Sequence, residues 1–426
     1  MTVQNSDCSA NVNSSASLRT EYPLACTTWG EEEIESVVKV LESGRHTMGD
    51  RVRLFESAVA SRFGSKHAIM VNSGSSANLL AVAAQMHRGE SPLQKGDEVL
   101  VPAVSWATTY FPVSQHGLRL RFVDIDKDTL NLDTSLLEDA ITPRTRALLA
   151  VNLLGNPNDF DVLRSFCQRH DLILLEDNCE SMGATYMSRH TGTFGECSTM
   201  STFFSHHICT MEGGLVLTDD EELAQIVTCL RAHGWTRELP EQNHVFDKTG
   251  DPFDDLFRFV LPGYNLRPLE IEAAVGIVQL RKLDNMLAER RKNAALFKEI
   301  FANREYVSTQ MTTGESSWFG FAMILQEELA GKRAEVVQAL TAAGIECRPI
   351  VAGNFARNPV VHKLDHSIHG TLDAADKIHK DGFFVGNHHY DISNELELLL
   401  DVLDSTAQQA ACSSANAASG QNRRIA

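Results

Sequence analysis

Short, solidly apolar runs alternate with amphipathic stretches along most of this chain, and this alternation most limits the folds that it can adopt. The first run, residues 68–72, leads through Gly74-Ser75-Ser76 into a helix-like stretch at 77–86. Similar runs follow at 98–102, 120–124, 147–152, 172–176, 200–204 and 214–218. Strands of a parallel sheet are buried on both faces and therefore read as continuous apolar runs. The pattern predicts an α/β fold around a large, mostly parallel sheet.

The pattern changes near residue 285. Helix-like stretches at 290–302 and 332–343 accompany strand candidates at 319–325 and 345–350. We therefore expect a large domain at 21–284 and a smaller C-terminal α+β domain at 285–403. Two tails, 1–20 and 404–426, contain few large apolar residues and are predicted to be disordered.

Charge and cysteine usage exclude several classes of protein. The chain has 38 basic and 56 acidic residues, a net charge of −18, whereas nucleic-acid binding needs a surplus of Lys and Arg. No apolar stretch is long enough to span a membrane, and the first 20 residues do not resemble a signal peptide. The nine cysteines are dispersed, which favours reduced thiols in a cytoplasmic protein without a metal site.

The turn after the first strand is a candidate phosphate site. Asn72-Ser73-Gly74-Ser75-Ser76 joins a strand end to a helix start, where free N–H groups and small side chains let a phosphate approach closely. An ordinary strand-to-helix turn capped by serine is an equally good interpretation of this motif alone.

Asp177 ends a second apolar strand, in Leu174-Leu175-Glu176-Asp177. Its carboxylate should therefore lie at the carboxyl edge of the sheet, where open α/β folds bind ligands. A buried carboxylate needs a cation or several hydrogen-bond donors, and a protonated pyridine nitrogen is one such cation. Without further motifs, a helix-capping aspartate would be the simpler interpretation.

A third motif decides between these interpretations. Residues 201–214 (STFFSHHICTMEGG) resemble the DegT/DnrJ/EryC1/StrS family of pyridoxal-phosphate (PLP) sugar aminotransferases, in which a lysine holds the cofactor covalently. His206 stands at the position of that lysine, and no lysine occurs between Lys127 and Lys248. The resemblance implies PLP fold type I, with PLP or its amine form, pyridoxamine phosphate (PMP), bound non-covalently.

Three further positions match the family pattern, and the resemblance implies their roles. Trp106 falls where an aromatic ring stacks on the cofactor, and Ser201 falls where a hydroxyl contacts its phosphate. Asn265, in Gly263-Tyr264-Asn265-Leu266-Arg267-Pro268, matches an asparagine that reaches the phosphate of the neighbouring subunit, which implies a homodimer.

One departure from the family pattern points to a subgroup. Glu180 stands where the family usually has Gln or His, so a carboxyl beside the cofactor's phenolic oxygen should carry a proton or change that oxygen's protonation. Together with Ser205-His206-His207, this resembles dehydratases that act on a GDP-linked 4-keto-6-deoxy sugar. The resemblance implies that L-glutamate converts PLP to PMP, releasing 2-oxoglutarate, and that the C3 hydroxyl of the sugar is then lost, with release of ammonia.

Within this scheme His206 is the expected catalytic acid and base, because imidazole with an ordinary pKa of about 6.5 suits proton transfer near neutrality. Arg231, His233 and Arg237 form a predicted basic cluster for substrate phosphate or carboxylate, and Arg348 is a second candidate. Surface ion pairing explains these four nearly as well. His207 has a small chance of a catalytic role, and Trp318 and Phe319 are expected in the core.

Three alternatives remain open. An aminotransferase or another nucleotide-sugar 3-dehydrase would share most of these motifs. An iron–sulfur dehydrase with a reductase partner is discounted, because such clusters need closely spaced cysteines. A PLP-binding sensor without catalytic activity is the alternative from a different class.

Overall fold

The computed structural model describes residues 20–422 and contains the predicted large sheet. Strands β8, β5, β4, β2, β3 and β13 run parallel in that order, and β9 pairs antiparallel with β8 and β1 at one edge. The strands are β1 (His67–Val71), β2 (Glu98–Pro102), β3 (Arg119–Val123), β4 (Thr145–Val151), β5 (Ile173–Asp177), β8 (Cys197–Ser201), β9 (Gly214–Thr218) and β13 (His366–Ile368). The predicted α/β fold is confirmed.

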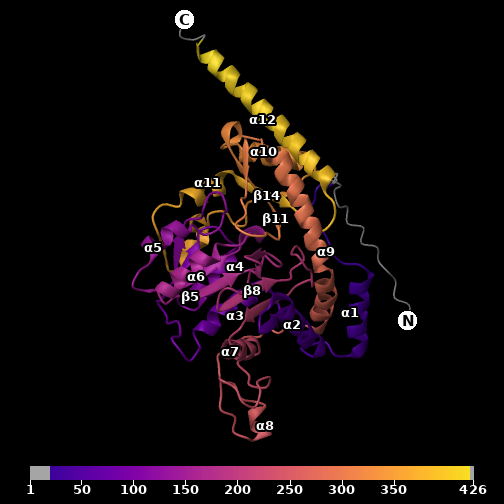
Figure 1. Ribbon diagram of the computed structural model, residues 1–426, viewed down its shortest axis with the longest axis vertical. Coiled ribbons are helices and arrows are strands. Elements are labelled where there is room, and N and C mark those ends of the chain that lie inside the picture. Colours follow the sequence, from indigo (N-terminus) through magenta and orange to yellow (C-terminus); the bar gives the residue numbers. More distant parts are fainter. Residues whose placement is uncertain (1–19, 423–426) are drawn as a thin grey trace, which may run out of the picture.

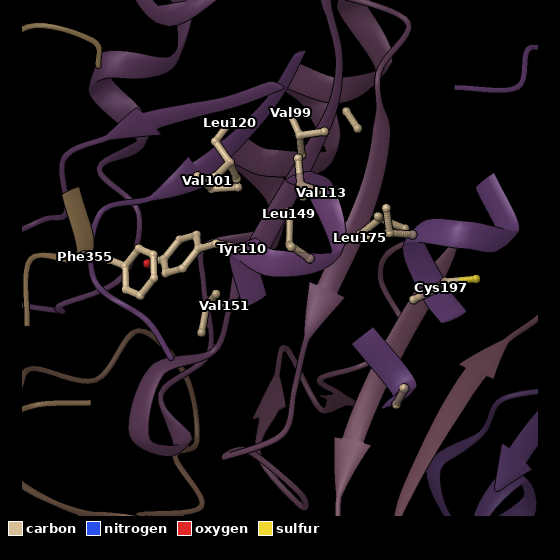
Figure 2. Packing of buried hydrophobic residues seen from close by; sticks show 14 of the residues in the cluster. Val99, Val101, Tyr110, Val113, Leu120, Leu149, Val151, Leu175, Cys197 and Phe355 are labelled. Carbon is tan, nitrogen blue, oxygen red and sulfur yellow. The ribbon is translucent and has the colours of Figure 1, made fainter. Parts of the chain in front are cut away.

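Helices cover both faces of this sheet, as Figure 1 shows. Val99 and Val101 of β2 point into one core with Tyr110 and Phe355 (Figure 2), whereas Leu100, between them, packs into the core on the other face. Burial on both faces is the reason for the apolar runs in the sequence. The covering helices are α2 (Asp50–Phe63), α3 (Gly74–Gln85), α4 (Ala107–Gln115), α5 (Leu137–Ala140), α6 (Phe160–Arg169) and α7 (Glu221–Arg231).

A smaller antiparallel sheet lies in the C-terminal part. Its order is β10 (Val307–Thr309), β11 (Gly320–Leu325), β14 (Gly382–Gly386) and β12 (Cys347–Arg348). Helices α10 (Arg333–Ala342) and α11 (Asp373–Asp381) belong to the same part of the chain. One element differs from expectation, because β13 belongs by sequence to the small domain but pairs with β3 of the large sheet.

The predicted domain boundary at 284/285 stays a prediction, and one continuous helix crosses it. Helix α9 (Glu270–Phe301) begins some 20 residues before the expected helix start and packs against α1 (Glu31–Ser43) and α2. It is the rod that runs from the lower to the upper part of Figure 1.

Residues 404–422 of the tail predicted to be disordered are instead helical, and residues 423–426 lie outside the described residues. Helix α12 (Ser393–Asn422) includes residues 404–422 and projects from the body at the C-terminal end (Figure 1). Ala407 and Ala410 are buried in the core of the small domain, and Asp404 accepts hydrogen bonds from Arg304 and Tyr306. The prediction of disorder was wrong because it relied on the scarcity of large apolar residues. The tail is rich in alanine, which is the strongest helix former and packs where larger residues cannot. The predicted N-terminal tail lies almost wholly outside the described residues.

The described residues contain no helix long and apolar enough to cross a membrane. Within the same part of the chain, every cysteine is free and no group of three metal-ligating side chains could hold a metal ion.

Candidate active site

A cavity of about 340 Å³ opens at the carboxyl edge of the large sheet. Its walls come from the ends of β4, β5 and β8, from the loop after β2, from the start of α3, and from β12 and β14 of the small sheet. The predicted residues that line it are Gly74, Ser75, Trp106, Asp177, Glu180, Ser201, His206 and Arg348. Tertiary structure thus gathers residues that lie up to 274 positions apart in the sequence, from Gly74 to Arg348 (348 − 74).

The start of α3 has the geometry of an anion site. Ser73 caps the helix by accepting a hydrogen bond from the Ser76 amide at 3.0 Å, so the first turn is fixed. A Cβ atom at Gly74 would lie 2.6 Å from the Ser201 Cβ, so only glycine lets the helix start approach β8 this closely. The exposed Ser75 hydroxyl and the free N–H groups of the first turn therefore face the cavity together, as phosphate binding requires.

Asp177 lies at the floor of the cavity and is 5% exposed. Its Oδ2 accepts hydrogen bonds from the Asn78 amide at 2.9 Å and the Thr109 hydroxyl at 2.7 Å, and its Oδ1 accepts one from the Cys179 amide. None of the described cations forms an ion pair with it. The carboxylate is therefore held in place by neutral donors and can still pair with a cationic ligand atom.

Trp106 and Glu180 complete the side walls. The Trp106 ring is 57% exposed at the first residue before α4, which leaves a large aromatic surface free beside the cavity. Glu180 accepts a hydrogen bond from the Leu154 amide at 3.0 Å. Burial, with a smaller contribution from the charge of Asp177, raises the pKa of Glu180 to about 7. This agrees with the expectation that the carboxyl can carry a proton.

His206 is the only imidazole among the residues that line this cavity within the described chain. Its ring packs against Phe319, with ring centroids 5.1 Å apart, and its Nδ1 is buried without a hydrogen-bond partner. Burial, and then the positive charge of Arg290, lowers the pKa of His206 to about 4, below the ordinary value expected from the sequence. The imidazole is therefore neutral at pH 7. No lysine of the described chain lines the cavity.

This set of side chains fits PLP. The cavity offers a glycine-lined helix start for a phosphate, an aromatic face for a flat ring, and a buried carboxylate for a protonated pyridine nitrogen. None of the described residues that line the cavity carries a primary amine that could bond the cofactor aldehyde.

The predicted basic cluster does not form. Arg231 is buried and paired with Glu56 at 2.6 Å and Glu238 at 2.9 Å, so its charge is already compensated and it does not line the cavity. His233 and Arg237 are exposed outside the cavity, and Arg237 lies over the Trp235 ring. The expectation that Arg231 binds substrate is contradicted, because the last turn of α7 directs it into the protein interior.

Asn265 also lies outside the cavity of its own chain. It is exposed, pairs its backbone with Ala232, and accepts a hydrogen bond from Arg267 at 3.0 Å. Its position leaves the side chain available to another molecule.

The structure adds residues that sequence reasoning missed. Trp318 is buried as expected, and Phe319 packs against the hydrophobic core as expected but also lines the cavity. Adjacent residues at a strand start point to opposite faces, and this periodicity could have separated the two aromatics. His207 is buried, with its Nε2 donating to the Ser317 carbonyl at 3.1 Å, and it does not line the cavity.

The chain is similar to known proteins over most of its length. The model of the DegT/DnrJ/EryC1/StrS aminotransferase family matches residues 27–395. A GDP-4-keto-6-deoxy-D-mannose 3-dehydratase from Yersinia pseudotuberculosis is 54% identical over 384 residues, which cover 90% of this chain and 98% of that protein. The structure of the E. coli GDP-4-keto-6-deoxy-D-mannose-3-dehydratase with bound hydrated PLP gives a TM-score of 0.89 at 51% identity, covering 91% of this chain and all (100%) of that one.

A second similar structure contains an amino donor. It is GDP-4-keto-6-deoxymannose-3-dehydratase with a trapped PLP–glutamate geminal diamine, with a TM-score of 0.88 at 51% identity. The match covers 90% of this chain and 100% of that one.

Proposed function

The chain belongs to the DegT/DnrJ/EryC1/StrS aminotransferase family, and from this premise we propose that the cavity around His206 is the active site of a GDP-4-keto-6-deoxy-D-mannose 3-dehydratase. The enzyme removes the C3 hydroxyl of that nucleotide sugar, with PLP as cofactor and L-glutamate as amino donor. The colitose branch of lipopolysaccharide O-antigen biosynthesis is the proposed setting.

One observation carries this proposal. The cavity holds a PLP-type set of donors, but an imidazole stands where the family's aminotransferases have the lysine. A lysine can both bond the cofactor and move protons, whereas an imidazole can only move protons. The cofactor can therefore remain in its amine form, so that elimination can replace transamination.

Several residues of the cavity are assigned to hold the cofactor. The start of α3 with Gly74 and Ser75, together with Ser201, would bind its phosphate. Trp106 would stack on the ring and Asp177 would pair with the ring nitrogen. When bound, the cofactor supplies an electron-withdrawing conjugated ring and, as PMP, the amine that condenses with the C4 ketone of the sugar.

Glu180 would lie at the phenolic oxygen of the cofactor. With a pKa raised to about 7 by burial, its carboxyl can donate a hydrogen bond there at neutral pH. The Glu180 carboxyl, which stands in place of the family's Gln or His, can thus keep its proton or release it as the charge at the phenolic oxygen changes.

His206 is assigned the proton transfers. Since its Nδ1 is buried, we assign this role to Nε2, where a neutral imidazole can accept a proton. The same nitrogen can then return the proton to the departing C3 hydroxyl, which leaves as water.

Arg348 is the one guanidinium among the described residues of the cavity wall, and it forms no ion pair with a described carboxylate. We assign it to a carboxylate of glutamate or to the diphosphate of the sugar nucleotide. Asn265 would act in a homodimer, in which its exposed side chain contacts the phosphate in the partner's cavity. A cytoplasmic location is proposed from the free cysteines of the described chain.

The test combines purified protein, PLP, L-glutamate and GDP-4-keto-6-deoxymannose. Mass spectrometry should show a product with one oxygen fewer at C3, and an ammonia assay should show equal release of ammonia. His206→Lys should shift the cofactor absorbance to that of a covalently bound form and reduce dehydration. Absence of product and ammonia with the unchanged protein would favour the non-catalytic sensor.

A further inference from the structure

The segment 317–319, whose Phe319 ring contacts His206, has a strained backbone. Trp318 has a φ of 50° and Leu154, which faces it, has a φ of 52°, a region that non-glycine residues rarely adopt. Two backbone hydrogen bonds join the segments, from the Ser317 amide to the Gly155 carbonyl at 3.0 Å and from the Phe319 amide to the Leu154 carbonyl at 3.1 Å. Such strain persists only when the surroundings hold it in place, and it gathers at functional sites.

Arg290 of α9 fixes this segment by hydrogen bonds to its backbone carbonyls. Its Nη1 donates to the carbonyls of Trp318 at 3.4 Å, Phe319 at 3.2 Å and Asn387 at 2.7 Å. The Asn387 side chain completes the clamp, with its Nδ2 donating to the Trp318 and Arg290 carbonyls, both at 3.0 Å. The clamped Phe319 ring contacts the rings of both His206 and His207.

Arg290 is also a buried charge without a counter-ion. It is 5% exposed, its Nε has no hydrogen-bond partner, and no carboxylate of the described chain forms an ion pair with it. Backbone carbonyls alone are an uncommon environment for a buried guanidinium, because burying a charge without a paired charge is costly. A charge retained under such conditions needs an explanation beyond packing.

The charge of Arg290 acts on the imidazoles around it. After burial itself, it is the next cause that lowers the pKa of His206, and it also lowers the pKa values of His207, His388 and His389. The other titratable or charged groups near these rings are Tyr22, Cys26, Asp177, Glu180, Glu212, Arg291, Arg348 and Tyr390.

We propose that Arg290 is a positioning residue for the proton transfers of this site, because its hydrogen bonds, together with those of Asn387, fix the Phe319 ring against the His206 imidazole. Its positive charge opposes protonation of the imidazole, and its hydrogen bonds hold the strained backbone that carries Phe319. The catalytic role of Arg290 rests on the proposed function. The effect of its charge on His206 and the fixing of the Phe319 ring are properties of the protein without cofactor.

The experiment follows the His206 imidazole by NMR in cofactor-free protein with isotope-labelled histidine, assigned through His206→Asn. In Arg290→Gln the pKa of His206 should rise toward its ordinary value of about 6.5. Correspondingly, the acid limb of kcat/KM should move to higher pH, because more of the imidazole is protonated at a given pH. Lys292→Gln is the matched control, since this exposed cation of the same helix pairs with Glu289 and Asp391 and should leave both quantities unchanged.

Asn387→Ala removes the side-chain hydrogen bonds to the Trp318 and Arg290 carbonyls but keeps the charge of Arg290. It tests the positioning of Phe319 separately, and it can be measured even if Arg290→Gln does not fold. Arg290 keeps its charge, so the pKa of His206 should stay near its wild-type value. The ring-current shift of the His206 resonances should change, and kcat should fall by up to about 100-fold while KM changes little, as expected for a misplaced catalytic group.

The inference is overturned if Arg290→Gln leaves the His206 pKa in place, if Lys292→Gln moves it equally, or if Asn387→Ala changes neither the ring-current shift nor kcat. Failure of the proposed function would look different. The wild-type protein would then give no product, while the NMR titrations would still respond to Arg290→Gln.

Discussion

At the scale of single residues, the cavity changes the protonation of two groups in opposite directions. Burial lowers the pKa of His206 to about 4 and raises that of Glu180 to about 7. Near pH 6 the cavity therefore presents a neutral base and a carboxyl that is largely protonated, rather than an ion pair. Low polarity favours the neutral form of every group, so burial is the largest cause of both shifts.

Glu180→Gln should stabilise the cofactor-free protein, and more so at pH 8 than at pH 5. A carboxyl whose pKa is raised in the folded state stabilises the protein below its unfolded pKa of about 4.3, and this contribution is lost as the pH rises through about 7. Glutamine is neutral at every pH and avoids the buried charge. Urea unfolding at the two pH values measures the difference between variant and wild type. Glu42→Gln, at an exposed position of α1, is the control. An equal increase in the free energy of unfolding at pH 5 and pH 8 would contradict the raised pKa of Glu180.

At the scale of elements, several cavity groups sit at an end of a strand or a helix. The start of α3 and the end of β8 touch at Gly74 and Ser201, and Asp177 is the last residue of β5. Ends of elements carry backbone groups without partners inside the element, so they can bind a ligand while the element stays rigid.

Gly74→Ala should weaken PLP binding by tenfold or more. The new methyl group would lie 2.6 Å from the Ser201 Cβ and 3.0 Å from the Cys179 Sγ, so α3 and β8 must move apart at the place assigned to the phosphate. Overpacking of this kind also lowers stability by about 1–3 kcal/mol. Fluorescence titration with PLP and thermal unfolding measure the two effects. Gly30→Ala is the matched control, because the nearest atom to its Cβ lies 3.7 Å away. Unchanged PLP affinity in Gly74→Ala would exclude α3 as the phosphate site.

At the scale of the whole molecule, the cavity is formed where two sheets meet. The large sheet supplies the groups assigned to the cofactor, and the small sheet adds Arg348 and Phe384 from the opposite side. Asn265 is the remaining assigned group, and it is exposed and does not line this cavity. If it has the proposed role, the site is complete only with a second copy of the chain.

Subunit complementation tests this arrangement. Asn265→Ala and His206→Asn should each be nearly inactive alone, while a mixture allowed to exchange subunits should regain up to about a quarter of wild-type activity. Half of the dimers are then mixed, and each mixed dimer has one intact site if Asn265 acts on its partner. Light scattering should report a dimer for each variant. No recovery in mixed dimers would place Asn265 outside the partner's site.

The sequence by itself determined the class of fold and the chemistry of the site. Apolar runs indicate buried parallel strands because burial on both faces leaves few places for polar residues, and the motif around His206 identifies the missing lysine without coordinates. Tertiary structure alone decided which charged residues face the cavity. Arg231 and Arg348 are alike in the sequence, but one is paired in the interior and the other lines the site. Only the fold could reveal the low pKa of His206 or its dependence on Arg290, since burial and charge act through distances in space that residue order does not contain.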